Sequence, residues 1–137
     1  MIILGRFWGF VAIALIIFCF LKIITHMFYH KFIRGLSKRR NRKLIDISTK
    51  ILKSLERNHT LCGIGALTAL VIHGIIMSIN VGFSFSGFLA GLSILFVIVI
   101  GLMNKLMYRD KKREFIKFHV IGSLVVILMI LIHINLN

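Results

Sequence analysis

The chain has 137 residues, of which 58% are hydrophobic, and its 18 Lys and Arg residues against 4 Asp and Glu residues give a formal net charge of +14. Soluble domains are typically about half apolar, so the mean hydropathy of +0.96 and the long uncharged runs exclude a soluble domain and indicate a membrane protein. The basic residues gather in two segments between apolar runs, a pattern of cytoplasmic loops that argues against nucleic-acid binding.

The first apolar run extends from about residue 7 to residue 29 and is expected to be a retained membrane span. It is longer than the apolar core of a signal peptide, only Arg6 precedes it, and no Ala-x-Ala-like cleavage site follows it. Lys22 lies near one end of the run, where its long side chain can carry the ammonium group to the membrane interface.

Residues 31–58 form a strongly basic segment that is expected to contain an amphipathic helix. Apolar residues recur in it at helical spacing, opposite Lys50 and Lys53, and these are Leu44, Ile47, Ile51, Leu52 and Leu55. Such a helix either lies on the membrane surface or extends the next span. The basic segment is expected to anchor to membrane lipid, and docking of a cytoplasmic partner is the alternative.

Three further spans are predicted, at about residues 59–79, 87–103 and 118–135. A short uncharged turn follows the first of these, and a second basic loop, residues 105–117, precedes the last. Because Lys and Arg concentrate in the two loops, both loops face the cytoplasm and both termini are extracytoplasmic. The expected fold is one all-α transmembrane domain over residues 1–137, an up-and-down bundle of four helices. Gly87 and Gly91 form a small-xxx-small pair that favours close helix packing.

Two of the predicted spans carry a histidine near each end. His59 and His73 are fourteen residues apart, and so are His119 and His133. Fourteen residues of α-helix rise about 21 Å and make about 3.9 turns, so the two imidazoles of a span point to nearly the same side at opposite depths of the bilayer. The two spans run in the same direction, which makes His59 level with His119 and His73 level with His133.

Two tiers of facing imidazoles predict two non-covalent b-type haems. The iron of the inner haem is expected between His59 and His119, and that of the outer haem between His73 and His133. Small residues along the same helix faces are expected to leave room for the macrocycles, and these are Gly63, Ala66, Gly122 and Ser123. Cys19 and Cys62 lie singly inside apolar runs, so no Cys-x-x-Cys-His motif offers covalent haem attachment.

Haem propionates need hydrogen-bond donors, and the basic residues near the predicted ligands can supply them. Arg57 and Lys117 adjoin the inner ligands in sequence, and Arg6 is expected to pair with an outer propionate, with a solvated interfacial charge as its alternative. His26 and His30 are four residues apart near the inner end of the first span. They form either a quinol site beside the inner haem or a pair of interfacial histidines near lipid headgroups or haem propionates, and the sequence favours the second interpretation.

The paired His-x13-His spacing, on two spans with one span between them, resembles diheme membrane b-type cytochromes, including respiratory cytochrome b and the ferric-reductase-like transmembrane family. Two stretches look most like the small four-span, flavinylation-associated members: Arg57-Asn-His59-x-x-x-Gly63 with His73-Gly74, and Lys117-Phe-His119-x-x-Gly122 with His133. The likeness covers about residues 57–135. Unlike full-length reductases, the chain carries no nucleotide- or flavin-binding domain.

This resemblance implies a multi-pass protein of the bacterial cytoplasmic membrane that transfers electrons across it. A quinol or a cytoplasmic donor would reduce the inner haem, and the outer haem would reduce an extracytoplasmic redox protein that carries flavin or haem. The chain is thus expected to be an electron-transfer subunit of an oxidoreductase. Two alternatives remain: a stand-alone quinol-dependent reductase of metal ions or small acceptors, and a non-redox membrane adaptor.

Overall fold

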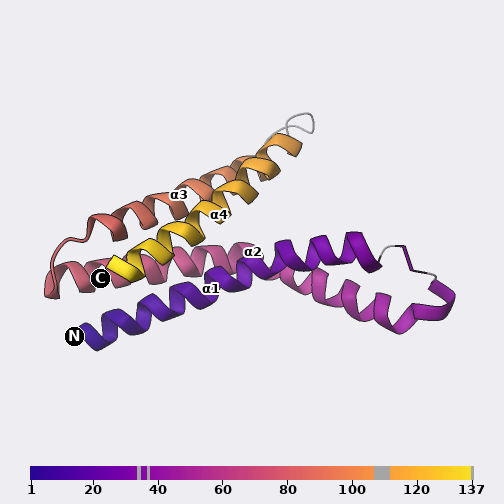
Figure 1. The fold of residues 1–137 in the computed structure, drawn as a ribbon, viewed down its shortest axis with the longest axis horizontal. Coiled ribbons are helices and arrows are strands. Elements are labelled where there is room, and N and C mark those ends of the chain that lie inside the picture. The colour runs from indigo at the N-terminus through magenta and orange to yellow at the C-terminus, as the bar shows by residue number, and fades with distance from the viewer. Residues whose placement is uncertain (34, 37, 107–111, 137) are drawn as a thin grey trace. The chain divides into compact units, whose positions relative to one another are not determined.

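The computed structural model describes residues 1–33, 35–36, 38–106 and 112–136. These residues form four α-helices and one short π-helix (Figure 1), namely α1 (Ile2–Phe28), η1 (Tyr29–Ile33), α2 (Lys38–Asn80), α3 (Phe85–Leu106) and α4 (Lys112–Leu136). Each α-helix is long and apolar enough to cross a membrane. The described part of the chain is therefore all-α and has the helices of a multi-pass membrane protein. Arg34 and residues 107–111 of the predicted basic loops lie outside the described residues.

Small residues are buried in these helices and large apolar residues are exposed. The most buried residues include Ala12, Ala66 and Ala69, each at 2% exposure or less, whereas Phe10 is 70% and Phe96 is 62% exposed. In water this distribution would be unfavourable. In a bilayer the lipid covers the large side chains, and small residues let the helix backbones approach closely.

The basic segment and the second predicted span form one helix, α2, which is 43 residues long. α2 is kinked at Asn41, which has non-helical backbone angles (φ −122°, ψ 30°). At 1.5 Å per residue the part after the kink, residues 42–80, is about 58 Å long, nearly twice the hydrocarbon thickness of a bilayer. The chain contains no proline, and no glycine occurs in α2 before Gly63, so nothing between the kink and Gly63 breaks the helix. The amphipathic stretch thus extends the span, which is one of the two arrangements the sequence allowed.

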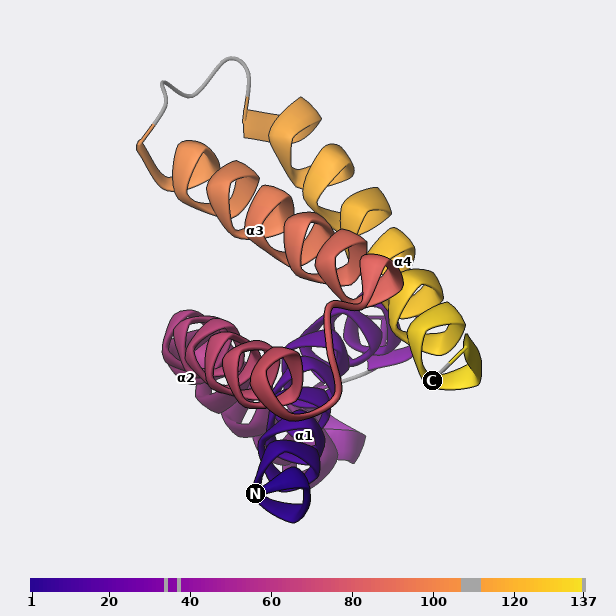
Figure 2. The same ribbon diagram turned by 90° about the vertical axis from the view of Figure 1, so that its left-hand side faces the viewer.

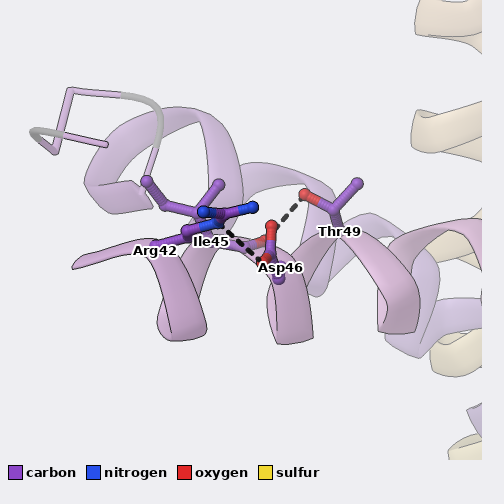
Figure 3. Close-up of polar contacts among 4 residues, drawn as sticks. All are labelled: Arg42, Ile45, Asp46 and Thr49. Atoms are coloured by element: carbon purple, nitrogen blue, oxygen red, sulfur yellow. Dashed lines mark hydrogen bonds and ion pairs between the residues drawn. The ribbon is translucent and has the colours of Figure 1, made fainter. Parts of the chain in front are cut away.

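Local polar contacts support the beginning of α2 (Figure 3). The Arg42 guanidinium lies 4.0 Å from the Asp46 carboxylate one turn later, and the Thr49 hydroxyl donates to the Ile45 carbonyl at 2.7 Å. Both partners of the ion pair are exposed, so the pair adds only a few tenths of a kcal/mol.

The chain divides into two compact units, one made of Met1–Ala12 with Leu67–Asn137 and the other of Ile13–Ala66. In the first unit, α3 and α4 lie side by side and run antiparallel (Figures 1 and 2). A Cβ atom added to Gly122 of α4 would lie 2.7 Å from Val97 Cγ2 of α3. Glycine at this position therefore lets the two helices approach closely.

The turn between α2 and α3 belongs to the same unit. Gly82 has a φ of +110°, which glycine adopts without a steric penalty. Its amide donates to the Met77 carbonyl at 3.3 Å, and the Val81 amide donates to the same carbonyl at 2.8 Å, so both cap the end of α2. The Ser84 hydroxyl then accepts from the Gly87 amide at 3.3 Å and caps the beginning of α3.

The second unit contains the second half of α1 and the first half of α2. Leu55 is 5% exposed and anchors the packing of α2 in this unit. A Cβ atom on Gly65 would lie 3.3 Å from Leu15 Cδ1 of α1, and the Cys19 thiol lies 3.6 Å from the His59 carbonyl. Cys19 is therefore level with His59 along the two helices.

The close approach of α3 and α4 predicts that Gly122→Leu destabilises the protein. The new side chain would displace Val97, and overpacking of this kind costs about 1–3 kcal/mol. Thermal unfolding in detergent, followed by circular dichroism, measures the loss. Gly74→Leu is the matched control, because a Cβ atom on Gly74 meets no atom within 4 Å; equal unfolding temperatures for the two variants would contradict the proposed packing.

Candidate functional site

His73 of α2 is held by two glycines of α1. Its Nδ1 atom lies 2.8 Å from the Gly5 carbonyl oxygen. A Cβ atom added to Gly9 would lie 2.9 Å from the same Nδ1 atom, so the imidazole lies directly against the Gly9 backbone. Gly5 is itself buried. The imidazole thus occupies the space that a side chain at Gly9 would fill, and it makes a hydrogen bond with the Gly5 carbonyl one turn earlier.

His119 of α4 makes the same arrangement with α3. Its Nδ1 atom lies 3.0 Å from the Val97 carbonyl oxygen, and a Cβ atom on Gly101 would lie 3.0 Å from its Cε1 atom. Val97 precedes Gly101 by four residues, as Gly5 precedes Gly9.

The geometry of the α-helix explains why the same four-residue step recurs. Each carbonyl points along the helix axis toward residue i+4, whose amide donates to it, and still has a second lone pair. A side chain at i+4 would cover that lone pair. Glycine at i+4 uncovers it, so an imidazole from the neighbouring helix can lie on the glycine and donate to the carbonyl.

His133, the second histidine of α4, also lies on a glycine of α3. A Cβ atom on Gly87 would lie 3.0 Å from its Cε1 atom, and its Nδ1 atom lies 3.0 Å from the Ser86 hydroxyl. Gly87 and Gly101 are fourteen residues apart on α3, the separation of the two histidines on antiparallel α4. One helix therefore holds both histidines of the other at matching positions.

These contacts determine which ring nitrogen carries the proton. A carbonyl oxygen can only accept a hydrogen bond, so Nδ1 must be the donor in His73 and in His119. In a neutral imidazole this leaves the lone pair on Nε2. An Nδ1–H group bonded to a backbone carbonyl, with Nε2 available as ligand, is the usual arrangement of metal-binding histidines.

The structure brings together the predicted outer pair. The ring centres of His73 and His133 lie 6.3 Å apart, with 81° between the ring planes. A metal binds an imidazole nitrogen at about 2 Å, and the ring centre lies about 1 Å beyond, so two imidazoles on opposite sides of one metal have centres about 6 Å apart. Rotation about the nitrogen–metal axis does not change this separation. The separation of the two ring centres is thus close to that of two imidazoles that bind one metal.

The predicted inner ligands belong to different units, His59 to Ile13–Ala66 and His119 to the other. Their pairing stays a prediction. In its own unit His59 is half-buried and its Nδ1 atom is buried. A Cβ atom on Gly63, one turn along the same face of α2, meets no atom within 4 Å, so there is open space beside His59.

The other small residues of the predicted site make local contacts. Ala66 is 2% exposed, and Gly122 packs against Val97. The Ser123 hydroxyl donates to the His119 carbonyl at 2.7 Å. Gly122 therefore has a structural role in joining α3 to α4, and the predicted role of leaving room for a macrocycle stays a prediction.

The predicted charged and titratable residues lie on the surface. Arg6, Arg57 and Lys117 are exposed, as donors that reach a propionate at the membrane edge would be. His26 and His30 are exposed too, with ring centres 4.4 Å apart, and His30 lies in the π-helix η1. Pairing of the two rings fits both interpretations that the sequence left open.

Sequence reasoning missed the contribution of α1 and α3 to this site. It treated Gly87 as a helix-packing residue and gave no role to Gly9 or Gly101. A signal was nevertheless present, because Gly87 and Gly101 repeat the separation of fourteen residues seen in both histidine pairs. When two glycines of one span and two histidines of its antiparallel neighbour have the same separation, each histidine can be expected to lie against one glycine.

Comparison of the chain with protein-family models, with curated proteins and with solved structures finds no match.

The carbonyl contacts predict that the haem-free protein holds His73 and His119 as Nδ1–H tautomers. Nitrogen-15 NMR of the protein labelled at histidine distinguishes the two tautomers by chemical shift. Gly101→Leu should change the signals of His119, because its ring can no longer lie against α3, and should leave those of His73 unchanged. Gly74→Leu serves as the control. Nε2–H signals for both histidines of the unsubstituted protein would refute the assignment.

Proposed function

We propose that this protein is a diheme b-type membrane cytochrome, a four-span up-and-down bundle that passes electrons across the membrane. His73 and His133 would hold one haem and His59 and His119 the other. The proposal follows from the repeated histidine spacing and from the resemblance of residues 57–135 to the small four-span cytochromes.

The observation that carries the proposal is the geometry of His73 and His133. Their ring centres lie 6.3 Å apart, close to the roughly 6 Å expected for two imidazoles that bind one metal from opposite sides, and Nδ1 of each makes a hydrogen bond with α1 or α3. Among the described residues, no group of three or more His, Cys, Asp or Glu side chains could hold a bare metal ion. Two imidazoles suffice only when the equatorial ligands come from elsewhere, as they do from a porphyrin.

The chain's own residues would orient the ligands and restrict the chemistry. The Gly5 and Val97 carbonyls hold the imidazole planes of His73 and His119 and would increase the basicity of their ligating nitrogens. The Ser86 hydroxyl holds the ring of His133. Bound haem supplies one-electron transfer, and two histidine ligands leave no open position for oxygen.

Loop charge gives the direction in which the helices cross the membrane. The basic segments at residues 31–58 and 105–117 would lie in the cytoplasm, and both termini outside. Electrons would enter at the inner haem, from a quinol or a cytoplasmic donor, and leave at the outer haem to an extracytoplasmic protein that carries flavin or haem. Arg6 is well placed in sequence to interact with an outer propionate, since it follows Gly5, which holds His73.

Haem content tests the proposal. Protein purified after expression with ample haem should show a reduced-minus-oxidised b-type spectrum with about two haems per chain. His73→Ala and His119→Ala should each remove about one haem, because each deletes one axial ligand. His26→Ala is the control and should keep both. A colourless preparation would refute the cytochrome and favour a membrane adaptor. Quinol oxidation by ferric iron without any partner would identify a stand-alone reductase.

Gly63 offers a test that separates haem binding from folding. Because a Cβ atom there meets no atom within 4 Å, Gly63→Leu should leave the unfolding temperature of the haem-free protein unchanged. In protein expressed with haem, the leucine would occupy the space beside His59 that the proposal gives to the inner haem. The haem content should therefore decrease from about two haems per chain to about one. Gly74→Leu, which also meets no atom within 4 Å, should retain both. Full haem content in the Gly63 variant would contradict a macrocycle at this position.

A further inference from the structure

A shallow hollow on α2 is lined by Lys50, Lys53, Ser54 and Arg57. Its volume is about 270 Å³, several times the roughly 30 Å³ that one water molecule occupies. The hollow can therefore admit a polyatomic anion. Three cationic side chains and a hydroxyl are the donors that bind phosphate oxygens.

The acidic residues nearby do not neutralise these cations. Asp46, one turn before Lys50, lies 4.0 Å from the Arg42 guanidinium. Glu56 follows Lys53 by three residues, a spacing at which side chains of a helix are neighbours. Among the described residues, however, the ion pair within the 4.0 Å limit is that of Arg42 with Asp46 and does not involve Glu56. Even with Glu56 counted, the three cations of the hollow keep an excess of positive charge.

The continuity of α2 places the hollow at a defined depth. Residues 58–80 contain no charged side chain, and 23 residues of helix are about 34 Å long, close to the hydrocarbon thickness of a bilayer. Arg57 is the first charged residue beyond this stretch. Lys53 lies about 6 Å further along the axis and Lys50 about 10 Å. The layer of lipid headgroups is about 5–8 Å thick, so the three side chains reach into it.

An apolar stripe adjoins the basic one. Leu44, Ile47 and Ile51 are each about half exposed and recur at helical spacing on α2. A basic stripe beside an apolar stripe is typical of helices that interact with an anionic membrane surface. Because Arg57 directly precedes the uncharged stretch of the same helix, the lipids that reach the hollow are those of the leaflet at that end.

We propose that Lys50, Lys53, Ser54 and Arg57 form a binding site for the phosphate group of an anionic phospholipid in the cytoplasmic leaflet. The two lysines and the arginine compensate the phosphodiester charge, and the Ser54 hydroxyl donates a hydrogen bond. The lipid would fix the depth of α2 in the membrane and thereby the depth of His59. The site does not depend on haem, so it stands or falls separately from the cytochrome.

Native mass spectrometry of the purified full-length protein tests the site. The protein in mild detergent is titrated with dioleoyl-phosphatidylglycerol or with dioleoyl-phosphatidylcholine, and bound lipids are counted. We expect a clear preference for phosphatidylglycerol. Each basic residue at a membrane surface changes the affinity for anionic lipid about fivefold, so Lys50→Gln with Lys53→Gln should reduce phosphatidylglycerol binding by roughly tenfold or more.

Lys31→Gln with Lys43→Gln is the matched control. It removes the same charge from exposed positions, and Lys43 lies on the same face of α2, seven residues further from the span. This variant should keep the preference. An equal loss in both variants would show that net charge alone acts and overturn the proposal. Displacement of the lipid by millimolar inorganic phosphate would identify a site for a soluble anion instead, and equal binding of the two lipids would refute an anion site.

Discussion

The hydrogen bond from an imidazole to a backbone carbonyl, across the bare surface of a glycine, is the interaction on which the structure depends. It occurs between His73 and α1 and between His119 and α3. In both places the bond joins two helices, holds a ring and assigns its proton to Nδ1. His133 makes its hydrogen bond with the Ser86 hydroxyl, beside Gly87. A side chain on the glycine would remove both the space and the exposed carbonyl.

This interaction suits a membrane. A polar group left without a partner in hydrocarbon costs several kcal/mol, so a buried imidazole needs an acceptor. Side-chain acceptors are scarce here, because the four acidic residues all lie in the basic segments. Backbone carbonyls are available at every turn of helix, and glycine selects which of them can accept. A glycine also lets two helices approach closely at Gly122, where α4 packs against α3.

The two proposals assign different parts of α2 to different tasks. Its second half carries His73 and is bonded to the beginning of α1, whereas its first half carries the basic hollow and the apolar stripe. The two parts follow one another along the same helix. If both proposals hold, α2 would carry a lipid site and a haem ligand, whereas a separate amphipathic helix on the membrane surface would carry only the first.

Charge and hydropathy in the sequence determined the four helices that can cross a membrane, and the spacing of fourteen residues determined which histidines share a face. These properties are local, since they follow from the rise and turn of a single helix. The tertiary structure decided that α2 continues through the basic segment, that Gly122 packs against Val97, and that Gly5, Gly9, Gly87 and Gly101 receive the imidazoles. Register between helices depends on the side chains of both partners. The matching separation of Gly87 and Gly101 is visible in the sequence, but only packing shows that these glycines, with Gly5 and Gly9, lie against His133, His119 and His73.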